Sequence, residues 1–425
     1  MGRDISKNRR VVVTGVGILS PLGLSADEHF ERLTAGQSGI APISIFASPD
    51  FPVRFAGEVR GFKANRFIKN RKSIKIMARD IQLAVAASSL AAAHSGIHEG
   101  VNEPHRFGVS MGAGLIPSQL DELGVAVAAG LNADGGFDTA RYGREGLPLL
   151  FPLWLLKYLP NMLNSHAALE YDARGPNNCI TCGNASGLLA IGEAARVIER
   201  GQADIMLAGA AESKIHPLAL ARLHILGKLS SENDLPDRGP RPFCGSRAGL
   251  VAAEAGAVLV LEEQEHAAGR GAAALARVAG FGSSCGAQLS EELEHGGRAA
   301  ADAMAAALAD AGLDAGDVDA VFANASGLYE DDDEAVAIVN VFGRGKPVTT
   351  VKAAVGHSMA ASGALELATA VLALSRGMLP ATFGVESCGD TPVDLVSEKR
   401  RGDFGAFMIN SFSFGGQAAS LVIAR

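Results

Sequence analysis

The organisation of this chain is decided by two similar segments, Ser186-Gly-Leu-Leu-Ala-Ile-Gly-Glu-Ala-Ala-Arg-Val-Ile-Glu-Arg-Gly201 and Ser362-Gly-Ala-Leu-Glu-Leu-Ala-Thr-Ala-Val-Leu-Ala-Leu-Ser-Arg-Gly377. The second begins 176 residues after the first (186 to 362), and the two share Ser-Gly at the start, Arg-Gly at the end and an alanine between them, Ala194 against Ala370. The match indicates two copies of a strand-turn-helix unit, and therefore two related halves. Chance similarity between two Ala-rich helices is the alternative interpretation.

Short β-branched stretches alternate with Ala-rich stretches, which is typical of an α/β protein whose strands are buried on both faces. We expect a strand at 10–15 and helices at 26–35 and 76–95. Further strands are expected at 106–111, 203–209, 257–261, 320–324, 347–351, 406–411 and 419–423. Because residues 10–19 and 277–285 suit the first strand of each half, we expect an N-terminal half at 1–265 and a C-terminal half at 266–425.

The composition excludes several classes of function. Of the 425 residues, 48% are hydrophobic and 20% are charged, which predicts a globular protein with a large core. The net charge of −8 argues against nucleic-acid binding. The longest apolar stretch, Leu147 to Leu156, is too short to span a bilayer. Five cysteines, an odd number, and no signal-peptide pattern predict a reducing, cytoplasmic location.

Four sets of motifs occur in order along almost the whole chain. They are Arg10-Val-Val-Val-Thr-Gly-Val-Gly-Ile-Leu-Ser-Pro-Leu-Gly23; Arg241-Pro-Phe243 with Arg247-Ala-Gly-Leu-Val251 and Glu254-Ala-Gly256; Val351-Lys352 with Gly356-His-Ser-Met-Ala-Ala-Ser-Gly-Ala-Leu-Glu366; and Asn410-Ser-Phe-Ser-Phe-Gly-Gly416. They resemble the motifs of β-ketoacyl-acyl-carrier-protein synthases, members of the thiolase-like superfamily. The resemblance implies an α/β, thiolase-like fold with duplicated βαβαβαββ halves in an αβαβα five-layer arrangement.

The resemblance also implies a nucleophile position that this chain fills with an amide. In the family, a Cys thiolate at the start of a buried helix takes an acyl chain from a carrier protein. With Gly175-Pro176 and Ser186-Gly187 as fixed points, Asn184 stands where that Cys belongs. An amide has no nucleophilic lone pair at neutral pH, so a covalent acyl-enzyme is excluded at this position. This chain is therefore not expected to condense acyl units by itself.

In the family, two histidines stabilise the enolate that is left when a malonyl thioester loses carbon dioxide. This chain retains one of the two. The family's Asn-Ala-His-Gly signature reads Asn324-Ala-Ser-Gly327 here, so Ser326 replaces the first His. A hydroxyl donates one hydrogen bond but carries no positive charge. The second His is retained as His357, with the family's Lys at Lys352. No cofactor and no metal are expected in this site.

Two neighbouring features have a simpler interpretation. Cys179 and Cys182 form a lone Cys-x-x-Cys, which we interpret as packing rather than as a redox or metal site or a substitute nucleophile. Residues 327–335, with the acidic run 330–334, depart from the family's Gly-Thr-Ser-Thr-Pro loop. We expect this run to be a solvated loop.

The loss of the Cys and of the first His resembles the chain-length factor, the ketosynthase-beta subunit of type II polyketide synthases. The resemblance implies a subunit that pairs with an active ketosynthase, as a heterodimer or else a homodimer, and shapes the elongation tunnel for chains bound to an acyl carrier protein. One alternative is a malonyl-carrier-protein decarboxylase using Asn184 and His357, because related domains carry an amide at this position. A structural scaffold and an unorthodox β-ketoacyl synthase are the remaining alternatives.

The resemblance assigns three further features. Phe414 falls on the family's gating Phe, although Gln417 replaces the usual Thr. Residues 151–162 fall where the family builds its dimer contact and tunnel floor, with Trp154, Leu155, Tyr158 and Met162 as candidates; an ordinary buried helix is the alternative. A basic cluster would attract an acidic carrier protein, with a solvated helix face as its alternative. Its members are Lys63, Arg66, Lys69, Arg71 and Lys72.

Overall fold

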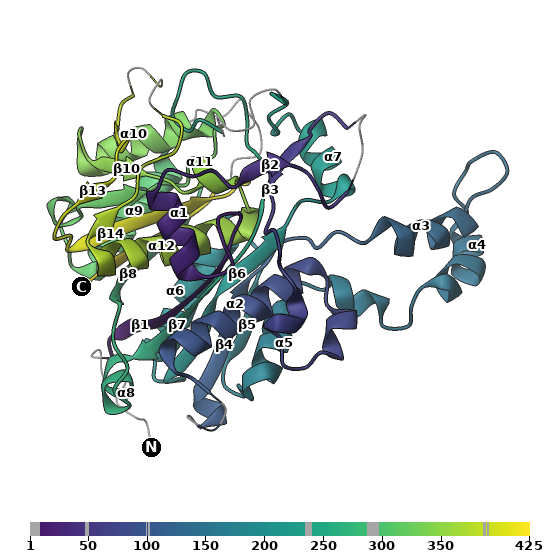
Figure 1. The fold of residues 1–425 in the computed structure, drawn as a ribbon, viewed down its shortest axis with the longest axis horizontal. Coiled ribbons are helices and arrows are strands. Elements are labelled where there is room, and N and C mark those ends of the chain that lie inside the picture. Colours follow the sequence, from purple (N-terminus) through teal and green to yellow (C-terminus); the bar gives the residue numbers. More distant parts are fainter. Residues whose placement is uncertain are drawn as a thin grey trace.

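An eleven-stranded sheet runs through the molecule in the order β12-β10-β9-β14-β15-β8-β1-β7-β6-β4-β5 (Figure 1). The computed structural model describes residues 9–46, 51–98, 100, 103–233, 240–286, 297–385, 388 and 391–425. The strands are β1 (Val11–Leu19), β4 (Phe107–Gly112), β5 (Asn177–Ile180), β6 (Ile205–Ser213), β7 (Glu254–Glu263), β8 (Ala276–Cys285), β9 (Ala320–Phe322), β10 (Pro347–Thr349), β12 (Asp394–Leu395), β14 (Ala406–Phe412) and β15 (Gln417–Ala424).

The two halves of this sheet repeat the same topology. The order β1-β7-β6-β4-β5 in one half corresponds to β8-β15-β14-β9-β10 in the other. In each set of five the last three strands are parallel and the remaining pairs are antiparallel, and the C-terminal half carries one extra edge strand, β12, parallel to β10. The halves join where Val11–Val13 of β1 pair with Ala276–Val278 of β8. The predicted duplication is thereby confirmed.

Helices complete the layers on both sides of the sheet and between its halves. Helix α2 (Arg79–Ser95) covers β1, β6 and β7 on one outer face, and α9 (Arg298–Ala311) covers β8 and β15 on the other. Between the halves lie α6 (Ser186–Glu199) and α12 (Ser362–Arg376), which contact each other and strands of both halves (Figure 1). This arrangement confirms the predicted thiolase-like fold.

The Ser-Gly that begins each repeated segment has a packing reason. A Cβ on Gly187 would collide with the carbonyl oxygen of Ala360 and the side chain of Ala364, and one on Gly363 would collide with Ser411. Glycine at 187 allows α6 to approach the start of α12 closely, and glycine at 363 allows α12 to approach β14 closely. The Ser-Gly shared by the two segments therefore reflects the close packing of both helices at their first turns.

The predicted elements agree with the structure apart from their ends. Helix 26–35 is α1 (Ala26–Thr34), capped by Ser25, and the helix predicted from residue 76 begins at Arg79. The remaining helices are α3 (Leu120–Ala129), α4 (Thr139–Arg141), α5 (Met162–Tyr171), α7 (Pro217–Ile225), α8 (Gln264–Gly269), α10 (Glu330–Phe342) and α11 (Lys352–Val355). Two small ladders pair β2 (Ile40–Pro42) with β3 (Phe55–Gly57) and β11 (Met378–Leu379) with β13 (Arg400–Arg401).

Residues 115–155, which we call the arm, leave the end of β4 and project from the body of the molecule (Figure 1). The arm carries α3 and α4 and is rich in exposed apolar side chains. These are Leu115, Leu120, Val125, Val127, Leu131, Phe137, Leu147, Leu149, Phe151, Leu153 and Leu155. Monomeric soluble proteins rarely expose so many neighbouring apolar groups, so the arm has the character of an interface.

Two further features bear on the expectations from composition. The structure joins Cys244 to Cys388 in a disulfide, which the cysteine count did not anticipate, while Cys179, Cys182 and Cys285 are free thiols. Among the residues that the structure describes, no helix combines the length and apolar character needed to cross a bilayer.

Candidate active site

Asn184 lies at the corner between β5 and α6, two residues before the helix begins, and is buried. Gly183 takes a left-handed conformation there, with φ of 56°, where a Cβ would collide with Ser413. The Ser186 hydroxyl accepts a hydrogen bond from the Cys182 N–H (2.7 Å) and donates one to the Gly183 carbonyl (2.6 Å). The corner thus places the amide at the N-terminal end of a central helix.

The end of β14 holds the backbone of Asn184 on both sides. The Ser413 hydroxyl accepts a hydrogen bond from the Asn184 N–H (2.9 Å) and donates one to the Cys182 carbonyl (3.1 Å). The Ser411 hydroxyl donates to the Asn184 carbonyl (3.0 Å). The Asn184 N–H is therefore already engaged within the chain.

His357 is buried with one ring nitrogen satisfied and the other without a partner. Its Nδ1 accepts hydrogen bonds from the Met359 N–H (3.0 Å) and the Ser362 hydroxyl (3.2 Å). This network assigns the ring proton to Nε2, which has no hydrogen-bond partner among the described residues. Burial, with a smaller contribution from the positive charge of Lys352, lowers the pKa of His357 to about 3. The imidazole is neutral and offers one unused donor.

We predict that His357 stays neutral, with its proton on Nε2, from about pH 8 to about pH 5. The pKa of about 3 lies below the 6.5 of an unperturbed imidazole, so the unfolded chain takes up the proton first as pH falls. His357 therefore contributes stability above about pH 6.5 that is lost between there and about pH 3. Nitrogen-15 NMR of histidine-labelled protein checks the protonation state, and a His357 titration midpoint near 6.5 would contradict it.

The turn after His357 is strained and is fixed by a residue that the sequence reasoning missed. Met359 has a φ of 48°, which is unfavourable for a side chain of this kind. The carboxylate of Glu212, buried at the end of β6, accepts a hydrogen bond from the Ala360 N–H (2.6 Å). Glu212 also pairs with Lys214, whose Nζ donates to the Leu115 carbonyl at the root of the arm (2.7 Å). In the sequence, the only sign of this role is that Glu212, a charged residue, closely follows the apolar strand predicted at 203–209.

Lys352, the first residue of α11, forms a buried ion pair. Its Nζ lies 3.3 Å from Oε1 of Glu366, which also accepts a hydrogen bond from the Thr350 hydroxyl (2.7 Å). Both charged side chains are almost completely buried. The lysine thus fixes the segment before His357 to α12.

We predict that Lys352→Met lowers the free energy of unfolding by about 3–5 kcal/mol, because it leaves the Glu366 charge buried without a partner. Urea denaturation at neutral pH measures the change. The double variant Lys352→Met/Glu366→Gln should regain most of the loss, since the unpaired charge is gone. A single variant as stable as the parent chain would show that the pair is not needed.

Ser326 lies in a loop held by two carboxylates of α10. Asp331 accepts hydrogen bonds from the N–H groups of Ser326 (2.8 Å) and Gly327 (2.9 Å), and its Oδ1 lies 3.5 Å from the Ser326 hydroxyl. Glu334 accepts the N–H groups of residues 324 and 325. The expectation of a solvated acidic loop is wrong: the run forms the first turn of α10, because this tight loop needs buried acceptors for its backbone donors.

The Cys-x-x-Cys thiols are half-buried beside this site. Burial raises the pKa of Cys179 to about 11, and burial, followed by the nearby Cys285, also raises that of Cys182. Raised values keep a thiol protonated, which disfavours a nucleophilic role. The part of the chain that the structure describes also contains no group of three or more His, Cys, Asp or Glu side chains suited to a metal ion.

Phe414 lies in the turn between β14 and β15 and is 44% exposed. The Ser413 N–H donates to the Gln417 carbonyl (2.8 Å), and the Gly416 N–H donates to the Ser413 carbonyl (2.9 Å). Because Ser413 also bonds to Asn184, this turn lies directly beside the candidate nucleophile position.

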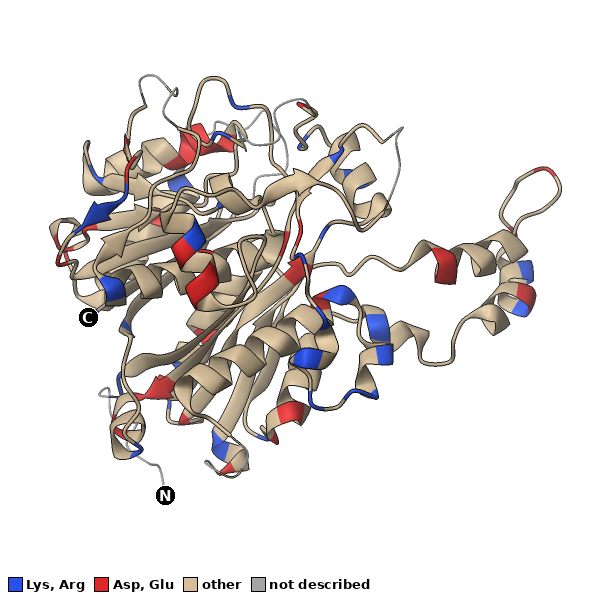
Figure 2. Cartoon of the chain, viewed as in Figure 1, with Lys and Arg blue, Asp and Glu red and all other residues tan. Residues whose placement is uncertain are grey.

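The basic cluster lies on exposed irregular backbone between β3 and α2, beside α5 (Figure 2). Only short 3-10 turns interrupt this segment, at Ala64–Arg66 and Ser73–Ile76, so the alternative of a helix face is wrong. Nζ of Lys69 lies 4.9 Å from the centre of the Tyr171 ring. Within the described ranges, none of the five side chains has an acidic partner at ion-pair distance. The charges of Lys63, Arg66, Lys69, Arg71 and Lys72 are therefore available to a partner.

The candidate tunnel residues lie where the arm returns to the body. Trp154 and Tyr158 belong to one 3-10 turn, with ring centres 5.3 Å apart, and the Tyr158 hydroxyl donates to Glu122 of α3 (2.6 Å). Leu155 is exposed, and Met162 begins α5. Tyr158 is buried, and Trp154 and Met162 pack against the same core, so these side chains are partly buried within the chain itself, in a 3-10 turn and at the start of α5.

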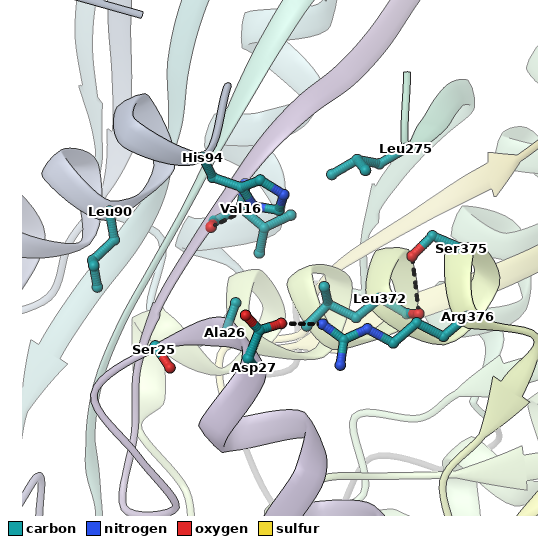
Figure 3. Close-up of a pocket in the computed structure, with 10 residues that line it drawn as sticks. All are labelled: Val16, Ser25, Ala26, Asp27, Leu90, His94, Leu275, Leu372, Ser375 and Arg376. Atoms are coloured by element: carbon teal, nitrogen blue, oxygen red, sulfur yellow. Dashed lines mark hydrogen bonds and ion pairs between the residues drawn. The ribbon is translucent and has the colours of Figure 1, made fainter. Parts of the chain in front are cut away.

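A cavity of about 430 Å³ lies away from these residues, between α1, α2 and the end of α12 (Figure 3). His94 accepts a hydrogen bond from the Val16 N–H (3.2 Å), and Arg376 pairs with Asp27. Its lining contains none of the predicted site residues.

Comparisons with known proteins agree with the fold. Residues 8–267 match the β-ketoacyl synthase N-terminal domain, and residues 275–386 match the C-terminal domain. The chain is 34% identical to 3-oxoacyl-[acyl-carrier-protein] synthase 2 of Vibrio cholerae serotype O1, over 98% of this chain and 99% of the relative. Among solved structures it resembles the ishigamide ketosynthase/chain length factor, with a TM-score of 0.84 and 29% identity over 98% and 99% of the two chains. It also resembles a type II polyketide synthase ketosynthase in complex with its acyl-carrier protein, AntDE:AntF, with a TM-score of 0.85 and 27% identity over 98% and 99%.

Proposed function

Since the chain belongs to the β-ketoacyl synthase family, whose members act in fatty-acid and polyketide synthesis, we propose that it is a non-condensing, ketosynthase-like subunit. In this role it is the chain-length factor of a type II polyketide synthase, or of a similar fatty-acid-like system. One observation carries the proposal: an amide, Asn184, occupies the corner before α6 where the family's nucleophile would stand. Within this proposal the halves are residues 1–265 and 266–425, and the location is cytoplasmic.

The chemistry of the site supports this role. The Asn184 side chain forms no acyl bond at neutral pH, and its backbone N–H is engaged by Ser413. Ser326 supplies no positive charge to an enolate. His357 and Lys352 remain, but neither replaces the missing nucleophile. In our proposal the substrate chain is therefore attached to another subunit.

The surface supports a partner of the same fold. Strand β5 ends the sheet, its outer edge pairs with no other strand among the described residues, and Asn177 and Asn178 on it are exposed. The apolar arm follows β4, the strand next to β5, and the chain returns from it through α5 to β5. An unpaired edge and an exposed apolar surface are both costly unless covered. We propose that an active ketosynthase covers them in a heterodimer and that Trp154, Leu155, Tyr158 and Met162 help to shape its tunnel; a homodimer is the alternative.

The basic cluster supports the carrier protein as the second partner. Its unpaired positive charges stand out on a chain of net charge −8 and would attract an acidic surface over long range. We propose that it docks the acyl carrier protein and that Phe414 acts as the gate beside Asn184.

A malonyl-carrier-protein decarboxylase is the second candidate, favoured by the unused Nε2 donor of His357. The test is carbon dioxide release from malonyl-carrier protein by the purified chain alone. We expect no more release than from His357→Ala. Release that His357→Ala abolishes would favour the decarboxylase instead. Conversely, if the chain is co-expressed with a ketosynthase, Trp154→Ala should change the length of the product.

A further inference from the structure

A single ammonium group, Nζ of Lys228, contacts two aromatic rings and a carboxylate beside the candidate site. It lies 4.7 Å from the centre of the Tyr329 ring and 5.2 Å from the centre of the Phe414 ring. It also donates a hydrogen bond to Oε1 of Glu330 (2.7 Å). A cation over an aromatic face is attracted by the negative face of the ring, and the attraction grows as water is excluded. The Lys228 side chain is only 13% exposed.

Three segments far apart in the sequence meet at this ammonium. Lys228 follows α7, and its carbonyl accepts a hydrogen bond from the Leu250 N–H (2.9 Å), which fixes the backbone from which the side chain extends. Tyr329 and Glu330 stand at the start of α10, and Phe414 is in the turn between β14 and β15. Through Phe414, the turn between β14 and β15 therefore contacts Lys228, a residue far from it in the sequence.

We propose that Lys228 is a positioning residue that holds Phe414, and with it the turn 413–416, in place over Asn184. The neighbouring residue in that turn, Ser413, is the one that engages the Asn184 N–H. While the turn is held, that N–H stays occupied and is not offered to a thioester. The contact itself does not depend on the proposed function. Only the interpretation of this turn as the gate beside Asn184 rests on the proposed function.

The charge needed for this contact is secured locally. Burial is the largest single effect and disfavours the ammonium, but the hydrogen bond to Glu330, the charge of Glu330 and the contribution of Tyr329 together outweigh burial and raise the pKa of Lys228. Tyr329 and Glu330 both belong to residues 327–335, the stretch that departs from the loop of active synthases. Tyr329 and Glu330, the α10 side of the contact, thus belong to a stretch in which this chain departs from the family pattern, whereas Phe414 matches that pattern.

Hydrogen exchange of the chain alone tests the proposal, because it needs neither a ketosynthase nor a carrier protein. In Lys228→Met, the amides of Asn184, Ser413 and Gly416 should exchange about two- to fivefold faster, since one cation–π contact to the turn is lost. Lys228→Arg should restore the slow rates. Phe414→Leu, which removes the ring from an exposed position, should reproduce the faster exchange.

A matched control is Lys346→Met, because Nζ of Lys346 lies 5.5 Å from the centre of the Phe342 ring at the opposite end of α10. This control should leave the three amides unchanged. Unchanged exchange in both Lys228→Met and Phe414→Leu would overturn the proposal. Because acyl loading and partner binding are measured separately, that result would leave the proposed function standing, and a failure of the proposed function would leave the contact standing.

Discussion

Asn184→Cys should convert a chain that gains no acyl mass into one that gains one acyl group from acyl-carrier protein. The substituted thiol would lie at the N-terminal end of α6, where the helix dipole favours a thiolate. His357 is retained and neutral, so the surroundings of a family nucleophile are partly in place. Intact-mass measurement before and after incubation gives the result. We expect undetectable modification of the parent chain and nearly complete modification of Asn184→Cys.

Two controls make this prediction specific. Asn184→Gln keeps an amide and should gain no mass. Cys182 is an internal control, because it is a half-buried thiol two residues away in the same chain. Peptide mapping should place the acyl group at position 184 alone. Acylation of Cys182 in the unmodified chain would show that our assignment of the nucleophile position is wrong.

Charges placed on the arm should abolish its association with a ketosynthase partner. Leu149 and Phe151 are 54% and 52% exposed, and in our proposal they become buried at the interface. Leu149→Asp/Phe151→Asp would place two unpaired charges in an apolar contact, which we expect to weaken binding by at least about 100-fold. Sedimentation of the co-expressed pair measures the loss of the dimer, and the same change should dissociate a homodimer.

The control for the arm is Ile225→Asp on α7. Ile225 is 82% exposed, more than either arm residue, but lies outside the arm. It should leave association unchanged. If Ile225→Asp dissociated the pair and the arm variant did not, the interface would lie on a different face.

The fold was predictable because its constraints are local or repeated in the sequence. The Ser-Gly starts of α6 and α12 are needed where these central helices pack closely on α12 and β14, respectively, and the β-branched stretches suit strands buried on both faces. The position of Asn184 followed from fixed motifs on either side of it.

The supporting contacts were not predictable, because they join residues remote in sequence. Glu212 reaches Ala360 across 148 residues, and Lys228, which follows α7, meets the ring of Phe414 near the end of the chain. The acidic run at 330–334 was misassigned for the same reason. Its composition suits a solvated loop, and only the tertiary structure shows the backbone donors that Asp331 and Glu334 satisfy.

The most direct test is native mass spectrometry of this polypeptide co-purified with a co-expressed type II ketosynthase, after incubation with loaded carrier protein. The account predicts a one-to-one pair in which the growing chain is bound covalently to the companion and this polypeptide keeps its unmodified mass. A thioester on this polypeptide, formed when it is incubated on its own, would contradict the account.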